Sequence, residues 1–148
     1  MRIGVIGLGF MGTTHLKAWR NVAGAEIVAV CAEEEDRLTG DLSSVQGNLG
    51  GSGEKFDFSS MGRYRKPEDL IAQENVEAVD ICLPTHLHGP VAIAALRAGK
   101  HVLVEKPMAL TGAETDQMLA EASRTGQILM SGQVLRFLPA YRATADAL

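Results

Sequence analysis

Glu105 and Lys106 follow directly after the apolar run His101–Val104 and precede Pro107. An apolar run of this length predicts a short strand that is buried on both faces, so the two charges stand where the strand leaves the core. We expect them to form an ion pair, which is costly at such a position unless it is solvated or used. A lysine there can donate a hydrogen bond to a substrate oxygen or assist proton transfer. Lys106 is therefore our candidate catalytic residue.

A glycine-rich turn near the amino terminus is the second chemical signal. It follows the apolar run Ile3–Ile6 and has the sequence Gly7-Leu8-Gly9-Phe10-Met11-Gly12. In the order strand, glycine turn, helix, Gly7 permits a tight turn and Gly9 lets backbone N–H groups approach a pyrophosphate. Gly12 allows the helix to pack closely on the strand. These residues predict a dinucleotide whose phosphates lie at a helix N-terminus.

An acidic segment follows the second predicted strand, Glu26–Cys31. A dinucleotide site uses an acid about 20 residues after the glycine turn to bind the adenosine ribose hydroxyls. Ala32 is the first residue after the strand, so Glu33 is the best candidate, and the next acids favour a helix N-terminus. The acidic run would repel a 2′-phosphate, which favours NAD. The positive charge of Arg37 could attract a 2′-phosphate and so opposes this preference, and NADP stays the alternative cofactor.

Polar residues also follow two later strands. Thr85 and His88 come after the apolar run Val79–Leu83, and Gln133 follows Ile128–Ser131. Thr85 could cap the next helix, and His88 could either face the cofactor or serve as a capping or surface residue. No role for Gln133 follows from the sequence alone.

Strand and helix signals alternate along the chain, which predicts an α/β fold with a doubly wound parallel sheet of strand order 3-2-1-4-5-6. We expect helices at 11–21, 34–49, 67–73, 88–98, 111–125 and 139–148, and a short strand near Tyr64. The helix at 111–125 opens with a capping box, Thr111 to Glu114. Glycines and serines mark 47–62 as a long loop, for which a surface insertion without chemistry is the favoured interpretation.

Composition excludes several classes of protein. The chain has 148 residues, a net charge of −4 and no basic stripe, so we expect no nucleic-acid partner. No run approaches the ~20 apolar residues of a membrane span, and the first strand begins almost at Met1, so we expect a cytoplasmic protein. Cys31 and Cys82 fall on strands that flank the first strand, too far apart for a disulfide, and we expect buried thiols and no metal site.

These motifs in this order resemble the Gfo/Idh/MocA family, named for glucose–fructose oxidoreductase, inositol dehydrogenase and MocA. The most telling signature is Ala98-Gly99-Lys100-His101-Val102-Leu103-Val104-Glu105-Lys106-Pro107; the others are the glycine turn, Pro84-Thr85-His86-Leu87-His88 and Gly132-Gln133-Val134-Leu135-Arg136-Phe137. The likeness extends from Met1 to about Tyr141. It implies a Rossmann domain binding NAD or NADP, which we expect over residues 1–135.

The resemblance also implies roles for individual residues. Lys106 would touch the reacting hydroxyl and the nicotinamide ribose, with Glu105 and Pro107 shaping that corner. The cofactor path would be lined by Leu83, Pro84, Thr85 and His88. The family's second α/β domain is absent from this chain, and we expect residues 136–148 to begin the crossover to it.

The resemblance implies hydride transfer between the nicotinamide cofactor and a sugar or cyclitol hydroxyl or carbonyl. The family's catalytic His and Asp lie in the second domain, so we expect no turnover from these residues alone and a homo-oligomer for a full-length protein. Two alternatives stay open: an NAD-dependent glycosidase of the same fold, and a cofactor-sensing module without catalysis. We also expect an exposed apolar surface around Leu135, Phe137, Leu138 and Tyr141.

Overall fold

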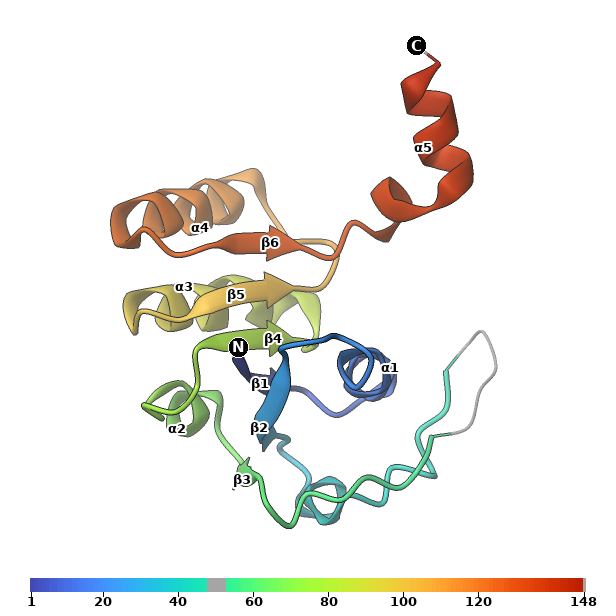
Figure 1. Ribbon diagram of the computed structural model, residues 1–148. Coiled ribbons are helices and arrows are strands. Elements are labelled where there is room, and N and C mark those ends of the chain that lie inside the picture. The colour runs from blue at the N-terminus through green and yellow to red at the C-terminus, as the bar shows by residue number, and fades with distance from the viewer. Residues whose placement is uncertain (48–52, 148) are drawn as a thin grey trace.

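A single six-stranded sheet forms the centre of the molecule (Figure 1). The computed structural model describes residues 1–47 and 53–147. All neighbouring strands pair in parallel, in the order β3-β2-β1-β4-β5-β6, which confirms the predicted doubly wound sheet. The strands are β1 (Arg2–Ile6), β2 (Glu26–Cys31), β3 (Gly62–Tyr64), β4 (Ala78–Ile81), β5 (His101–Val104) and β6 (Leu129–Ser131).

Helices cover the two faces of this sheet unequally (Figure 1). The α-helices are α1 (Phe10–Trp19), α2 (Pro67–Ile71), α3 (His88–Arg97), α4 (Gly112–Thr125) and α5 (Pro139–Asp146), and the short 3₁₀ helices are η1 (Glu35–Thr39), η2 (Thr85–Leu87) and η3 (Val134–Phe137). Leu16 of α1 packs with Ile3 and Val5 of β1 in one buried cluster. Helices α2, α3 and α4 contribute to a second cluster, which includes Ile81 of β4. Helix α1 therefore covers one face and α2 to α4 cover the other.

Side-chain alternation along β4 places one charge inside the protein. Val79 and Ile81 belong to the cluster under α2 to α4, so Asp80 between them points to the α1 side. Asp80 is fully buried there. A buried carboxylate needs hydrogen-bond partners, and β4 thus fixes where a polar group of α1 must lie.

The predicted helix at 34–49 is wrong. Over residues 34–47, the part of this range that the structure describes, the only helix is the 3₁₀ helix η1, whose C-cap Gly40 has φ +92°, a left-handed conformation that closes a helix. Leu38 and Leu42 are both buried, one on each side of the turn at Gly40. Their four-residue spacing therefore reflects two separate contacts with the core and not one face of a helix. The predicted end of that helix, Leu49, lies outside the described residues.

Two aromatic side chains anchor the predicted loop at 47–62 to the core, and its interpretation as an insertion without chemistry stays a prediction. Phe56 and Phe58 are buried, with ring centroids 5.9 Å apart, and belong to the cluster under α1. Asp41 and Lys55 form an antiparallel bridge that brings the two arms of the segment together. The part of the predicted loop at 48–52 lies outside the described residues.

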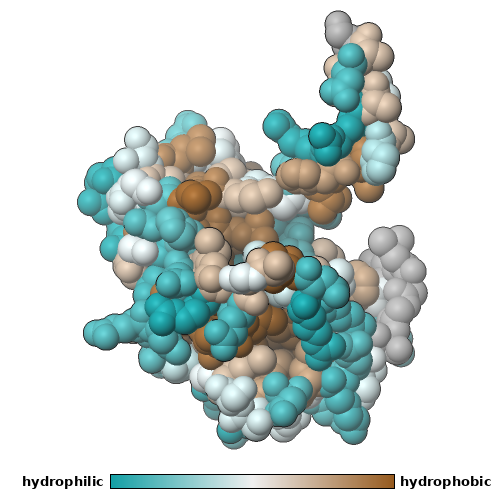
Figure 2. Space-filling model, in the orientation of Figure 1, coloured by the Kyte–Doolittle hydropathy of each residue, from teal (hydrophilic) through white to brown (hydrophobic). Residues whose placement is uncertain are grey.

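The carboxyl-terminal segment projects away from the sheet (Figure 1). The large apolar side chains in its described part are exposed, with exposed fractions from 45% to 61%. They are Leu135, Phe137, Leu138 and Tyr141, as predicted, and also Val134. Met130 of β6 is also 45% exposed. Figure 2 shows apolar side chains over β6 and at the base of α5. Among the described residues, no helix is long and apolar enough to cross a membrane.

Candidate functional site

The carboxyl ends of the central strands meet at one edge of the sheet. The backbone N–H of Gly7 donates to Cys31 O at 2.8 Å, and that of Cys82 donates to Ile6 O at 2.8 Å. On the other side, Glu105 N donates to Ile81 O and Gly132 N donates to Val104 O. The glycine turn and the segments that begin at Leu83, Lys106 and Gln133 therefore leave the sheet along the same edge. This is the edge at which open parallel sheets bind ligands.

The three glycines of the turn have different surroundings. Gly7 has φ +98°, and a Cβ there would lie 2.6 Å from Cys82 O, so the turn requires glycine. A Cβ on Gly12 would lie 1.8 Å from Gly7 O, which shows how closely α1 approaches the turn. A Cβ on Gly9 would meet only Arg37 Nη1, at 3.7 Å. Gly9 therefore leaves the space that a phosphate needs, while Gly7 and Gly12 shape the turn.

The first turn of α1 is open to an anion. Gly9 is the N-cap residue, no side chain in the described part of the chain caps the helix, and its first turn holds no acid. Phe10 and Met11 begin the helix and are half-buried, with Gly47 lying against the Phe10 ring. Unpaired N–H groups at a helix start favour phosphate, so these residues fit the pyrophosphate of a dinucleotide.

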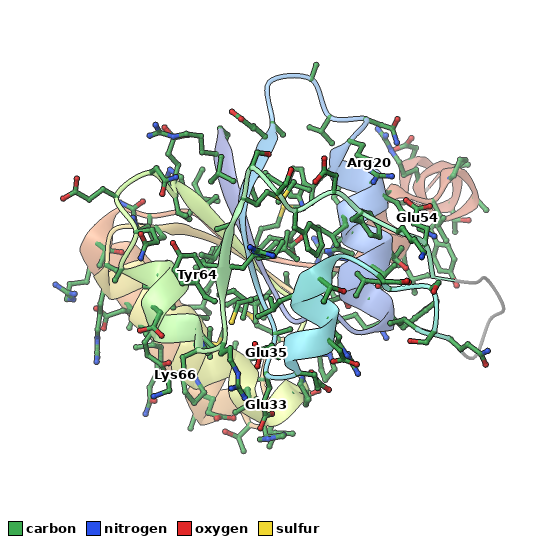
Figure 3. All side chains as sticks on the ribbon, turned by 90° about the horizontal axis from the view of Figure 1, so that it is seen from below. Arg20, Glu33, Glu35, Glu54, Tyr64 and Lys66 are labelled. Carbon is green, nitrogen blue, oxygen red and sulfur yellow. The ribbon has the colours of Figure 1, made fainter. Side chains whose placement is uncertain are left out.

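Charges of both signs surround the predicted ribose-binding acid, Glu33. Its side chain is exposed, and its backbone oxygen accepts a hydrogen bond from Arg65 Nε at 3.2 Å. Arg37 pairs with Glu34 at 3.0 Å, which offsets part of its charge beside Gly9. Figure 3 shows the side chains of Glu33, Glu35 and Lys66 near this corner. The structure thus brings Glu33 and Arg37 to the side of the turn where the adenosine end of a dinucleotide is expected.

The segment after β4 carries three of the residues predicted near the cofactor, Leu83, Pro84 and Thr85, and leads to His88. Leu83 and Thr85 are half-buried, Pro84 is exposed, and no side chain caps η2 or α3, so Thr85 is not a helix cap. The His88 ring is only 1% exposed. Its Nε2 lies 2.7 Å from Leu83 O and its Nδ1 lies 2.9 Å from Pro107 O. Both ring nitrogens lie within hydrogen-bond distance of backbone oxygens, so His88 links two loops of the site, and its contact with a cofactor stays a prediction.

Glu105 and Lys106 separate at the end of β5. Glu105 is 4% exposed, whereas Lys106 and Pro107 are exposed and joined by a cis peptide bond. Within the described residues the Lys106 ammonium has no ion-pair partner, so the predicted Glu105–Lys106 ion pair is wrong. Alternation explains this result, because consecutive residues leaving a strand point to opposite sides. Gln133, which follows β6, is exposed at the same edge.

The partner of Glu105 is His15 of α1. His15 Nε2 lies 3.0 Å from Glu105 Oε1, and His15 Nδ1 lies 2.9 Å from Asp80 Oδ2. The Trp19 indole N–H donates to the same Asp80 oxygen at 2.7 Å. Burial lowers the pKa of His15, but hydrogen bonds and charges from Asp80 and Glu105 outweigh it and hold that pKa above 6.5. Sequence reasoning missed this cluster, although Asp80 is the one charge within an apolar strand and so signals a buried partner.

The two cysteines are free, as predicted. Burial, followed by the charges of Glu68 and Asp69, raises the pKa of Cys31 to about 12. Burial and Asp80 likewise raise the pKa of Cys82, so neither thiol is a ready nucleophile. Cys82 lies near His15 and Asp80, close enough for the three to share a cation. The same atoms hydrogen-bond to one another in the structure, and the absence of a metal stays a prediction.

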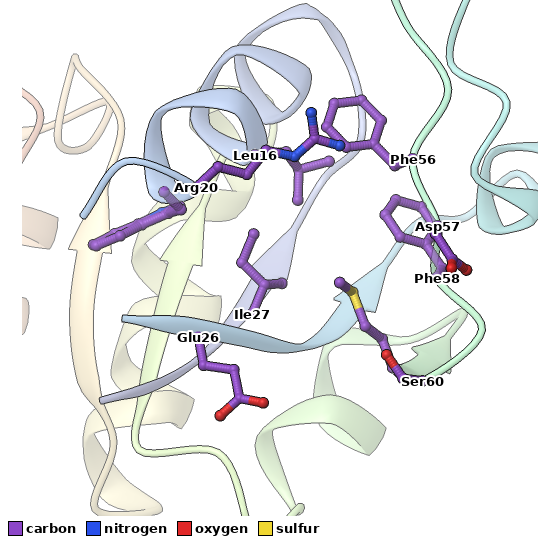
Figure 4. A pocket seen from close by; sticks show the side chains of 10 residues that line it. Leu16, Arg20, Glu26, Ile27, Phe56, Asp57, Phe58 and Ser60 are labelled. Carbon is purple, nitrogen blue, oxygen red and sulfur yellow. The ribbon is translucent and has the colours of Figure 1, made fainter. Parts of the chain in front are cut away.

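A shallow pocket of about 350 Å³ lies between the end of α1, the start of β2 and the segment that contains Phe56 and Phe58 (Figure 4). It is lined by Glu26 and Ile27 at the start of β2, by the end of α1, and by residues 56–58, 60 and 61. Two of its lining residues contact each other, since Arg20 Cζ lies 4.4 Å from the centroid of the Phe56 ring. Because this pocket opens at the amino end of β2, it is separate from the edge that carries Gly9 and Lys106.

A doubly wound sheet with an open glycine turn facing a helix start defines a dinucleotide-binding domain. The chain belongs to the Gfo/Idh/MocA oxidoreductase family, whose model, described as an oxidoreductase family with an NAD-binding Rossmann fold, matches residues 1–133. It is 38% identical over 137 residues to a myo-inositol 2-dehydrogenase of Thermotoga maritima, covering 93% of this chain and 37% of that protein.

Solved structures agree with this assignment. A probable dehydrogenase from Thermotoga maritima superposes with a TM-score of 0.83 at 33% identity, covering 99% of this chain and 40% of that one. A 3-ketoreductase from Actinomadura kijaniata, solved with NADP, superposes with a TM-score of 0.81 at 27% identity, covering 99% and 41%. The chain therefore spans about two fifths of the length of the proteins it matches.

Proposed function

We propose that this chain is the cofactor-binding part of an enzyme that transfers a hydride between a nicotinamide dinucleotide and a sugar or cyclitol carbon bearing a hydroxyl. One observation carries the proposal. Lys106 is exposed and unpaired among the described residues, at the same sheet edge as the open turn at Gly9. An unpaired ammonium beside a cofactor cradle can donate to the oxygen of a hydroxyl or carbonyl. The cyclitol dehydrogenase relative supports the substrate class.

The cofactor would be held by backbone and side chains at three points of this edge. The N–H groups of α1 would bind the pyrophosphate at Gly9, Phe10 and Met11, and Glu33 would bind the adenosine ribose. The other lining residues would be Leu83, Pro84, Thr85, Pro107 and Gln133. When bound, the nicotinamide ring supplies the hydride acceptor or donor. Lys106 would then hydrogen-bond the reacting oxygen and the nicotinamide ribose.

The proposed cofactor is NAD in preference to NADP. Glu33 is exposed where a 2′-phosphate would lie, and Arg37 is already paired with Glu34. Calorimetric titration of the chain with NADH and NADPH tests this proposal. Tighter binding of NADH supports it, tighter binding of NADPH reverses the cofactor choice, and a folded chain that binds neither overturns the proposed function.

Turnover has to be measured on a protein that includes a substrate domain. A panel of polyols and sugars should give net NADH formation, and Lys106→Ala should lower kcat/KM by about 10²- to 10⁴-fold. Release of nitrophenol from a nitrophenyl glycoside without net NADH would instead assign an NAD-dependent glycosidase. A protein whose function survives Lys106→Ala would be a cofactor sensor.

A further inference from the structure

A polar cluster lies behind the candidate site, between α1 and the sheet. Its members are Asp80 of β4, His15 and Trp19 of α1, and Glu105 after β5. Asp80 is 0% exposed and Glu105 is 4% exposed, so neither carboxylate is available to a ligand. The two carboxylates meet at the His15 ring, whose nitrogens lie 2.9 to 3.0 Å from oxygens of Asp80 and Glu105. The cluster thus joins α1, β4 and the segment after β5.

The partners of the ring define its state. Both nitrogens face carboxylate oxygens, and a carboxylate can only accept, so each nitrogen must carry a hydrogen for both bonds to form. Among the described residues, the titratable groups that contact His15 are Asp80 of β4, Cys82 directly after β4, and Glu105 directly after β5. A ring that carries both hydrogens gives each of the two buried carboxyl groups a hydrogen-bond donor. Without the ring, these two buried groups would lose that donor.

The cluster connects to the candidate catalytic lysine through the backbone. Glu105 Oε2 accepts a hydrogen bond from the Lys106 N–H at 3.0 Å, so the carboxylate that His15 holds also holds the Lys106 peptide. Gly132 packs against the same side chain, because a Cβ there would lie 3.1 Å from Glu105 Oε1. On the other side of Lys106, His88 holds Pro107 O at 2.9 Å. Lys106 thus stands between two anchored neighbours.

We propose that His15 and Asp80 are positioning residues that hold Glu105, and through it the main chain of Lys106, so that the lysine is presented to the nicotinamide half of the cofactor. This inference rests on the proposed function of Lys106. Neither His15 nor Asp80 touches the ligand edge. Their effect is confined to ligands that reach Lys106, and a ligand that uses only the glycine turn is indifferent to them.

Titration of the 148-residue chain with NADH and with ADP separates this role from a general effect on folding. ADP occupies the phosphate cradle but lacks the nicotinamide riboside. We expect His15→Gln to weaken NADH about tenfold, which is ~1.4 kcal/mol, and to change ADP affinity less than twofold. The matched control is His101→Gln at the other end of β5, which also removes a hydrogen-bond partner, of Ile128 N, and should change neither affinity.

A double-mutant cycle gives the decisive readout. If His15 acts through Lys106, His15→Gln should add no further loss in a Lys106→Ala background, where NADH is already weakened. Additive losses, equal weakening of ADP, or an unchanged NADH affinity in His15→Gln would each overturn the proposal. A wild-type chain that binds neither ligand would instead contradict the proposed function itself.

A milder variant covers the case in which His15→Gln does not fold. Asp80→Asn keeps an acceptor oxygen for the Trp19 N–H and removes the charge that favours the protonated ring. It should lower NADH affinity about three- to tenfold with ADP unchanged, and fluorescence of Trp19, the only tryptophan, reports whether the fold is intact. An unchanged ratio of NADH to ADP affinity in this variant would equally overturn the proposal.

Discussion

Adding one methyl group at Gly12 should lower both stability and cofactor binding, whereas adding one at Gly9 should lower binding alone, although both glycines belong to the same turn. A Cβ on Gly12 would lie 1.8 Å from Gly7 O and 2.9 Å from Gly7 C, whereas real Cβ atoms stay beyond 3.0 Å. Both obstructing atoms are backbone and cannot rotate away. Helix α1 would have to move from the turn by at least 1.2 Å, the difference between 3.0 and 1.8 Å.

This displacement is expected to lower the stability of the Gly12→Ala variant. Overpacking of this kind costs about 1–3 kcal/mol, which in a chain of this size lowers Tm by roughly 2–12 °C. The same movement separates the start of α1 from the turn, so cofactor binding should fall as well. We therefore expect Gly12→Ala to lower both the stability of the chain and its affinity for NADH.

Gly9→Ala should affect binding alone. The new methyl group meets only Arg37 Nη1 at 3.7 Å, and the φ of −77° suits alanine, so stability should change by less than about 0.5 kcal/mol. The methyl group occupies the space proposed for the phosphates. Loss of one charge-assisted hydrogen bond, worth about 1.5–3 kcal/mol, would weaken NADH about 10- to 150-fold.

Urea unfolding followed by Trp19 fluorescence measures stability, and calorimetric titration with NADH measures binding. The control is Gly112→Ala, whose Cβ meets nothing within 4 Å and which should behave as wild type in both assays. Wild-type NADH affinity in Gly9→Ala would refute the position of the phosphates. Equal stability of Gly9→Ala and Gly12→Ala would refute the packing argument.

Three further predictions concern charge and exposed surface. Because the folded-state pKa of His15 is raised, its contribution to stability is complete below pH 6.5 and is lost as pH rises through the folded pKa. The free energy of unfolding in urea should therefore fall over this pH range, and it should fall less in His15→Gln. Lys100 Nζ donates to Gln73 O at 2.7 Å and to Val76 O at 2.8 Å, and Gln73 O also accepts from Val76 N at 3.2 Å. Lys100→Met removes the Lys100 donor from Val76 O and should cost about 1–3 kcal/mol in urea unfolding without changing NADH affinity. The exposed apolar side chains at the base of α5 should cause association in light scattering at high concentration, reduced by Phe137→Ser, and a monomer at all concentrations would contradict this.

Local patterns were sufficient for most of the fold. The strands, the glycine turn and the cap of α4, where Thr111 Oγ1 accepts from Glu114 N at 3.2 Å, depend on residues close in sequence. The order of the strands was predicted from the doubly wound class that these local signals indicate. The helix predicted at 34–49 failed because apolar spacing does not distinguish a helix from a turn between two core contacts. Gly40 ends the helix, and the tertiary contacts of Phe56 and Phe58 fix the remainder of that segment.

The cluster of His15, Asp80 and Glu105 could not be predicted from the spacing of residues along the sequence. His15 contacts Asp80 across 65 residues and Glu105 across 90, so no local motif contains the three. One inference was nevertheless available. Asp80 stands in an apolar strand that flanks the first strand, and a buried acid there must find a donor on a helix that covers that face.

The segment that most strongly marks the family, Ala98–Pro107, shows why a motif does not by itself identify catalytic groups. It contains two lysines on either side of β5. Lys100 is 9% exposed and binds backbone carbonyls, a structural role at the amino end of the strand. Lys106 is exposed at the carboxyl end, where only its main chain is held, by Glu105. A side chain whose backbone is fixed and whose ammonium is unpaired in the described structure can interact with a ligand at little cost in reorganisation, and this difference is the reason that we propose Lys106, and not Lys100, as the catalytic residue.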